Sequence, residues 1–224
     1  MVDGWVLPKD VYSIFASGKQ NDVPLIVGTV ADDAPGRGAA PMRAADVPAY
    51  ARNTFGDLAD KYLKLYPART DAEAAASALA FRSNSAMANA RMWAGLQAKT
   101  GKSKVYWYFF SHVSPMPEGL VWGGKPAREW GAYHGSEIVY VFKAFPLQDW
   151  PWRPVDLKLG ETVSSMWVNF VRTGSPNGAG VPEWPAYDSA ADVLMNFGDS
   201  PKAQVAPFKE ALNFIEEWTA ARRR

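Results

Sequence analysis

The sequence contains no cysteine among its 224 residues. This absence excludes disulfide bonds, thiolate metal sites and a cysteine nucleophile. Histidine is nearly as scarce, because only His112 and His134 occur. Two histidines so far apart, without companion ligands at helical spacing, do not form a convincing zinc site. We therefore expect no metal, and no motif indicates a cofactor.

A strong charge of either sign is also lacking. The chain carries 24 Lys and Arg against 23 Asp and Glu, a net charge of +1, so electrostatics gives no reason to expect binding to nucleic acid or an anionic membrane. No stretch approaches the roughly 20 apolar residues that span a bilayer. The N-terminus also lacks the basic region and apolar run of a secretion signal.

The residues that are present indicate a globular α/β fold. A hydrophobic content of 48% and an aromatic content of 13% allow a sizeable core. β-branched and aromatic runs alternate with segments of helical spacing, which predicts a mainly parallel central sheet flanked by helices. The chain has no repeat and no clear linker, so we expect residues 1–224 to form one unit. Strands are predicted at 24–29, 105–110 and 193–197, and one helix is predicted from Thr70 towards Gly101. A second helix is indicated by an apolar face that Gly174 closes, made of Val163, Met166, Trp167, Phe170 and Val171. A third is indicated by an apolar stripe made of Phe208, Leu212, Ile215 and Trp218.

The first predicted strand leads directly into two acidic residues, Asp32 and Asp33. In open α/β sheets, ligand sites gather beyond the carboxyl ends of the strands. These two carboxylates therefore stand where chemistry is expected.

One histidine lies in a segment of small residues. Residues 130–137 read WGAYHGSE and precede the apolar run IVYVF. A histidine between small loop residues can turn its ring into a cleft, and histidine is the side chain best suited to proton transfer near neutral pH. A lone histidine is more often a structural group, so this pattern alone leaves both interpretations open.

The segment resembles the catalytic-histidine loop of the type B carboxylesterases, the cholinesterase-like branch of the α/β-hydrolases. Two further matches follow the order of that family. Residues 2–8 (VDGWVLP) and 23–33 (VPLIVGTVADD) resemble the strand and turn that carry the catalytic acid. Residues 167–177 (WVNFVRTGSPN) and 184–188 (WPAYD) are similar to its late helix and Trp-Pro-x-Tyr turn. The matches span nearly the whole chain and imply the C-terminal half of an α/β-hydrolase domain.

The resemblance also implies roles for individual residues. His134 corresponds to the catalytic base and Asp33 to the acid, where the family usually has glutamate; aspartate is shorter by about 1.5 Å. Asp32 remains an alternative acid. Glu137 matches a carboxylate that supports the histidine loop, although a simple surface acid is an equal interpretation. His112 has no counterpart, and we expect it to be structural or pocket-lining.

The nucleophile of the family is missing from this sequence. Relatives carry a serine in a G-x-S-x-G elbow upstream of the acid and the histidine, and no such pentapeptide occurs here. Residues 101–105 (GKSKV) fail at the last position, and the glycine-rich oxyanion loop is also absent. Gly36 and Gly38 are predicted to be turn glycines. The resemblance thus implies that an N-terminal portion supplies the serine. A signal would lie on that portion too, so bacterial cytoplasmic and secreted locations both stay open.

We predict a serine carboxylesterase that hydrolyses small carboxylic esters through an acyl-enzyme. The expected partner of this chain is the N-terminal half of the same enzyme, and the chain alone should be inactive. Half of such a sheet exposes an edge, which favours association or aggregation. Two alternatives remain: a non-catalytic cholinesterase-like protein used in binding or adhesion, and an inactive fragment.

Overall fold

A four-stranded sheet forms the centre of the computed structural model, which describes residues 2–33 and 42–223. The strands β1 (Leu25–Val30), β2 (Val105–Phe110), β5 (Val193–Phe197) and β6 (Lys202–Val205) lie in the order β1-β2-β5-β6. The pairs β1–β2 and β2–β5 are parallel and β6 is antiparallel, so the predicted mainly parallel sheet is confirmed. The turn predicted at Gly36 and Gly38 lies outside the described residues.

The middle strand β2 is buried on both faces. Trp107 and Phe109 belong to one core cluster, and Tyr106 and Phe110 belong to another on the opposite face. This burial explains why its sequence is an unbroken apolar run and not an alternating one. Full burial of a side chain such as Phe110 contributes roughly 1.5–3 kcal/mol, so β2 anchors both layers of the core.

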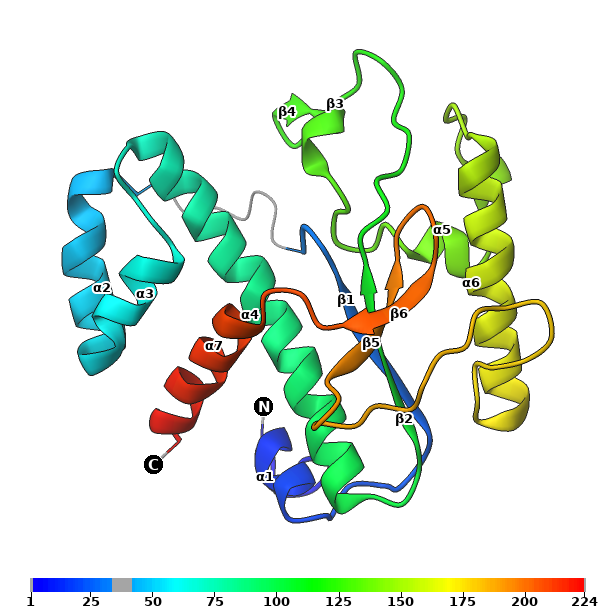
Figure 1. Cartoon of the computed structure of the whole chain (residues 1–224), viewed down its shortest axis with the longest axis horizontal. Coiled ribbons are helices and arrows are strands. Elements are labelled where there is room, and N and C mark those ends of the chain that lie inside the picture. Colours follow the sequence, from blue (N-terminus) through cyan, green and yellow to red (C-terminus); the bar gives the residue numbers. More distant parts are fainter. Residues whose placement is uncertain (1, 34–41, 224) are drawn as a thin grey trace.

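Helices cover both faces of the sheet (Figure 1). On one side lie α2 (Val47–Phe55), α3 (Ala59–Leu65), α4 (Asp71–Thr100) and α7 (Lys209–Ala221), with α1 (Val11–Ala16) against α4. The Thr70 hydroxyl caps α4 by accepting a hydrogen bond from the Glu73 N–H at 3.1 Å, and the helix ends before Gly101 as predicted. Short 3-10 turns occur on this side at Ala44–Asp46 and Gly56–Leu58.

On the other side lie α5 (Ile138–Val141) and α6 (Pro154–Thr173), with a 3-10 turn at Phe145–Leu147 between them. The predicted apolar face of α6 is buried at Val163 and Met166. Val171, also assigned to that face, is 81% exposed, and this assignment was wrong. Eight residues separate Val171 from Val163, so it sits at the margin of a stripe of period 3.6 and points to solvent.

A small segment outside the main sheet follows β2. It contains the hairpin β3 (Val121–Trp122) and β4 (Lys125–Pro126) and a 3-10 turn at Ala127–Trp130. Figure 1 shows this hairpin standing apart from the sheet, beyond the end where β2 finishes. Its exposed residues include Val121 and Trp122.

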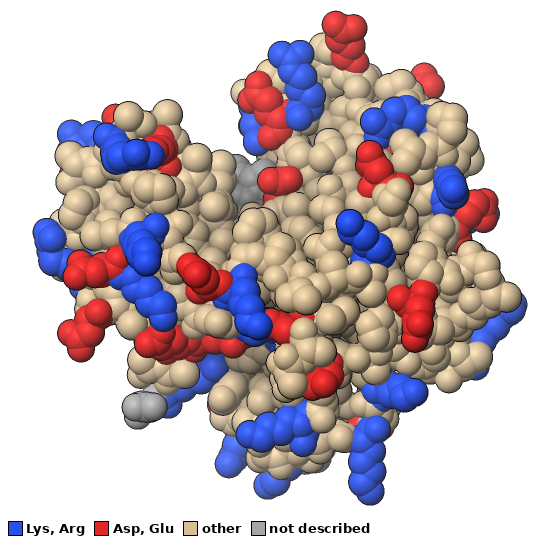
Figure 2. All heavy atoms as spheres, in the orientation of Figure 1, with Lys and Arg blue, Asp and Glu red and all other residues tan. Residues whose placement is uncertain are grey.

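The surface carries charges of both signs. On the face drawn in Figure 2, basic and acidic side chains are interspersed and do not gather in a single-sign patch. Within residues 2–33 and 42–223, no helix combines the length and the apolar character that crossing a membrane would require.

Candidate active site

The parallel pairing of β1 and β2 brings two distant loops to one edge of the sheet. Val30 pairs with Phe110 at the carboxyl ends of these strands. The chain leaving β1 immediately provides Asp32 and Asp33. The chain leaving β2 returns to the same edge, where the Asp32 N–H donates to the Ala132 carbonyl at 2.9 Å.

This edge carries a histidine–aspartate pair. His134 Nδ1 lies 2.5 Å from Asp33 Oδ1, and the side chain of His134 is 77% exposed while that of Asp33 is 16% exposed. A carboxylate only accepts hydrogen bonds, so we assign the donor as Nδ1–H. That tautomer leaves the lone pair on Nε2, which is the nitrogen that acts as base in a serine hydrolase triad.

Asp32 has a different partner from Asp33. Its Oδ2 accepts a hydrogen bond from the Ala132 N–H at 2.9 Å. The structure therefore brings His134 and Asp33 together, as the resemblance implied, and gives Asp32 a backbone partner instead of the imidazole.

Glu137 lies partly buried behind the histidine loop and is not a simple surface acid. The Tyr108 hydroxyl donates to its Oε1 at 3.3 Å, while Oε2 is buried without a partner among the described residues. Burial raises the pKa of the Glu137 carboxyl above its ordinary value, the Asp33 carboxylate adds to the rise, and Tyr108 and His134 oppose it. Burial also raises the pKa of Tyr108, and the charge of Glu137 adds to this effect.

Asp33 is the only hydrogen-bond partner of His134 within the described ranges. Ser136, the nearest serine in sequence, is fully buried, and its hydroxyl has no partner in that part of the chain. Ser136 is thus not poised as a nucleophile beside the imidazole, and no serine hydroxyl in the described part of the chain is hydrogen-bonded to that ring.

An aromatic cluster precedes the histidine. The ring of Trp122 lies 5.0 Å from those of Trp130 and Tyr133, measured between centroids. Lys125 Nζ stands 4.4 Å from the centre of the Trp130 ring. Because Tyr133 directly precedes His134 in the chain, this aromatic cluster lies next to the histidine loop.

The second histidine belongs to a separate network, in which His112 and Asp156 are buried while Arg153 and Asp199 are exposed. His112 lies within 2.6 Å of two carboxylates, through Nε2 to Asp156 and through Nδ1 to Asp199. Arg153 also donates to Asp156 through Nε at 2.9 Å. Burial alone would raise the pKa of Asp156, but the hydrogen bonds from Arg153 and His112 outweigh it and lower the pKa to about 2.

The sequence predicted a structural or pocket-lining role for His112, and its side chain is 0% exposed. Sequence reasoning missed its partners, since Asp156 and Asp199 lie 44 and 87 positions away. The available signal was weak: Arg153 and Asp156 stand at capping-box spacing at the start of α6.

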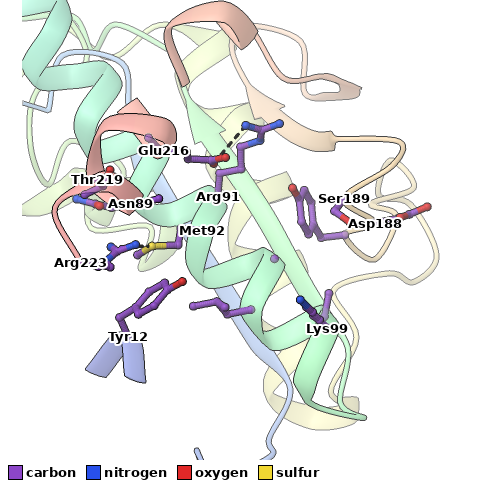
Figure 3. A pocket seen from close by; sticks show the side chains of 16 residues that line it. Tyr12, Asn89, Arg91, Met92, Lys99, Asp188, Ser189, Glu216, Thr219 and Arg223 are labelled. Atoms are coloured by element: carbon purple, nitrogen blue, oxygen red, sulfur yellow. Dashed lines mark hydrogen bonds and ion pairs between the residues drawn. The ribbon is translucent and has the colours of Figure 1, made fainter. Parts of the chain in front are cut away.

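Two of the clefts in the described part of the chain have linings that do not include His134. One of about 740 Å³ runs between α4, α7 and Tyr12 of α1. Figure 3 shows Arg91 reaching Glu216 across it, and Arg91 also pairs with the buried Asp192 at 2.8 Å. The second, of about 920 Å³, is mainly apolar and opens beside Asp32. Over residues 2–33 and 42–223, no group of three His, Cys, Asp or Glu is placed to hold a metal ion.

The mainly parallel sheet with helices on both faces is the architecture of an α/β-hydrolase fold. Solved structures of PNB esterases agree with this fold. The match to one PNB esterase covers 93% of this chain and 41% of the esterase chain, with a TM-score of 0.68 and 22% sequence identity. A thermophilic PNB esterase gives the same coverage, a TM-score of 0.70 and 21% identity.

The sequence comparison gives the family. The model of the carboxylesterase family matches residues 1–215, and this chain belongs to that family. Fumonisin B1 esterase of Sphingopyxis macrogoltabida is 28% identical over 210 residues, which are 88% of this chain and 36% of the relative. Liver carboxylesterase of Sus scrofa is 47% identical over 61 residues, 27% of this chain and 11% of the relative. The chain thus spans little more than a third of the length of fumonisin B1 esterase.

Proposed function

We propose that this chain contributes the base and the acid of a Ser-His-Asp triad to a carboxylic ester hydrolase. The observation that carries the proposal is the contact of 2.5 Å between His134 Nδ1 and Asp33 Oδ1, on a ring that is 77% exposed. A buried histidine would have no access to a nucleophile, whereas this ring meets its carboxylate on one side and is open elsewhere.

The chemistry follows from this geometry. His134 Nε2 takes the proton of a serine hydroxyl as that oxygen attacks the ester carbonyl, and returns it to the leaving alcohol, which leaves an acyl-enzyme. The same nitrogen then deprotonates the water that attacks the acyl-enzyme, and its proton returns to the serine oxygen. Asp33 holds the Nδ1–H tautomer and stabilises the imidazolium that forms at each transfer.

The serine comes from an N-terminal portion of the same enzyme. No G-x-S-x-G elbow occurs in this sequence, and the chain spans 36% of fumonisin B1 esterase. The sheet order begins at β1, so β1 has a neighbour on one edge only within the described residues. That free edge offers backbone N–H and C=O groups to a further strand, which makes it the expected joint with the N-terminal portion.

The substrate is a small-molecule carboxylic ester. The names of the relatives, fumonisin B1 esterase and liver carboxylesterase, denote ester hydrolases. The cluster of Trp122, Trp130 and Tyr133 supports an apolar or aryl group lying against these rings, because aromatic surface contributes strongly to binding. Glu137 supports the histidine loop from behind.

The test is complementation. The chain is co-produced with an upstream portion carrying a G-x-S-x-G elbow, and turnover of a chromogenic short-chain ester is measured. We expect activity in the complex, none in the chain alone, and a loss of at least about 10³-fold for His134→Gln. Full activity of His134→Gln would refute the proposal.

A serine-directed fluorophosphonate separates the alternatives. Labelling of the upstream serine that requires His134 supports the hydrolase. A well-formed complex that neither labels nor hydrolyses esters would instead support a non-catalytic binding protein.

A further inference from the structure

We propose that Asp32 is a positioning residue whose carboxylate fixes the loop that carries His134. This inference rests on the proposed function. Asp32 binds both polar groups of one loop residue: its Oδ2 accepts the Ala132 N–H at 2.9 Å, and its own N–H donates to the Ala132 carbonyl at 2.9 Å. Ala132 itself is 0% exposed, so these two hydrogen bonds lie where the loop enters the protein interior.

Gly131 leaves the space that the Asp32 carboxylate occupies. A Cβ at Gly131 would lie 2.1 Å from Asp32 Oδ2 and 2.6 Å from Asp32 Cγ, and the glycine has a φ of +62°. A side chain at position 131 would therefore both strain the backbone and displace the carboxylate. The close approach of the loop to Asp32 depends on the absence of that atom.

We call the two hydrogen bonds between Asp32 and Ala132 the Asp32 clamp. This clamp sets the position of His134 relative to Asp33. Asp32 directly precedes Asp33, and Ala132 lies two residues before His134. The two hydrogen bonds therefore tie together the backbone segments that carry the acid and the imidazole. The imidazole is 77% exposed, which means that packing does little to hold it. The loop backbone must then determine where Nδ1 lies relative to Asp33 Oδ1, a contact whose strength depends steeply on distance and angle.

The first test reads the imidazole tautomer in the full chain by long-range ¹H–¹⁵N NMR, which is simple because the sequence has two histidines. We expect His134 in the Nδ1–H form in the wild type and a shift towards the Nε2–H form in Asp32→Ala. Asp32→Asn keeps a carbonyl oxygen that can accept the Ala132 N–H, so it should restore the wild-type spectrum. The resonances of His112 should not move in any variant and report that the fold is intact.

A second variant attacks the same clamp from the loop. Gly131→Ala leaves Asp32 in the chain but displaces its carboxylate, so it should reproduce the tautomer shift of Asp32→Ala. The double variant should be no worse than Gly131→Ala, because both changes remove one shared interaction. Asp149→Ala, at an exposed acid, is the matched control and should resemble the wild type.

The complex with the upstream portion gives the kinetic readout. We expect Asp32→Ala to lower kcat by about 10²-fold with KM little changed, since a misplaced base affects chemistry more than binding. Asp32→Asn should recover most of kcat. A wild-type tautomer and wild-type kcat in Asp32→Ala would overturn the positioning role while leaving the hydrolase proposal intact.

The same measurements also distinguish the case in which the positioning role holds and the proposed ester hydrolysis does not. A tautomer shift in Asp32→Ala, together with a wild-type complex that hydrolyses no ester, supports the positioning role and refutes the proposed activity. An Nε2–H tautomer in the wild-type chain would overturn both.

Discussion

His134 Nδ1 meets Asp33 Oδ1 at 2.5 Å although 101 positions separate the two residues in the chain. The register of two parallel strands accounts for the meeting, because Val30 and Phe110 end β1 and β2 at the same edge. The loops that leave these strands therefore start side by side. Five predictions rest on this pair and on the layers that hold it.

Replacement of the acid should disable catalysis in the complex. Asp33→Asn keeps the size of the side chain but can donate to Nδ1, which favours the tautomer with its lone pair on the wrong nitrogen. By analogy with other serine hydrolase triads, kcat/KM should fall by about 10⁴-fold. Ester hydrolysis by purified complexes measures this, with Asp149→Asn as the control. A loss smaller than tenfold would mean that Asp33 does not orient the base.

Glu137 should make stability depend on pH. Its folded pKa is raised above the ordinary 4.5, chiefly by burial, so the fold is favoured by the neutral carboxyl. This contribution is fully present below 4.5 and is lost as pH rises through the folded pKa. Glu137→Gln removes the dependence. We expect equal Tm values near pH 4 and a higher Tm for the variant near pH 8, measured by thermal unfolding of the chain. A gap that closes with rising pH would contradict this sign.

The network around His112 should be a major source of stability. Asp156 is 0% exposed and accepts hydrogen bonds from Arg153 and His112. Removal of one member of a buried ion pair typically costs about 3–5 kcal/mol, so Asp156→Asn should lower Tm by roughly 6–20 °C. Asp149→Asn should leave Tm unchanged, and a similarly small effect of Asp156→Asn would show that the network is dispensable.

The same carboxylate should contribute to acid unfolding. The pKa of Asp156 is lowered from 3.8 to about 2. A lowered folded pKa gives stability that is present above 3.8 and is lost as pH falls towards 2. The wild type should therefore lose its advantage over Asp156→Asn across this window, which denaturant unfolding at several pH values can follow.

Two glycines should respond to alanine in opposite ways. A Cβ at Gly28 in β1 would lie 2.3 Å from Tyr108 Cδ1, whereas a Cβ at Gly95 in α4 would meet nothing within 4 Å. Overpacking should make Gly28→Ala less stable by about 1–3 kcal/mol. Gly95→Ala should gain about 0.5–1 kcal/mol, because alanine loses less entropy in a helix. Urea unfolding of both variants checks this, and a stable Gly28→Ala would indicate that Tyr108 can move without loss.

Local signals predicted much of the sheet and helical framework. The strand expected at 105–110 has the observed bounds of β2, and the helix begins after Thr70 and ends before Gly101, as predicted. A hydroxyl cap, a terminal glycine and an aromatic run act within a few residues, so sequence alone reports them. β6 was missed because Lys202–Val205 is short and mostly exposed and exists through its antiparallel pairing with β5. Four residues are too few for their alternation of polar and apolar side chains to mark a strand.

Sequence by itself determined that a histidine with small neighbours and an acid at a strand end were the candidates for chemistry, since residue type and spacing are local properties. The family resemblance favoured Asp33 as the acid, but residue type and spacing left Asp32 open, because the two are adjacent and chemically identical. Only the tertiary structure decided which of the two contacts the imidazole. Neighbouring side chains leave the backbone in different directions, so when the loop returned to this edge, Asp33 received the imidazole and Asp32 the Ala132 N–H.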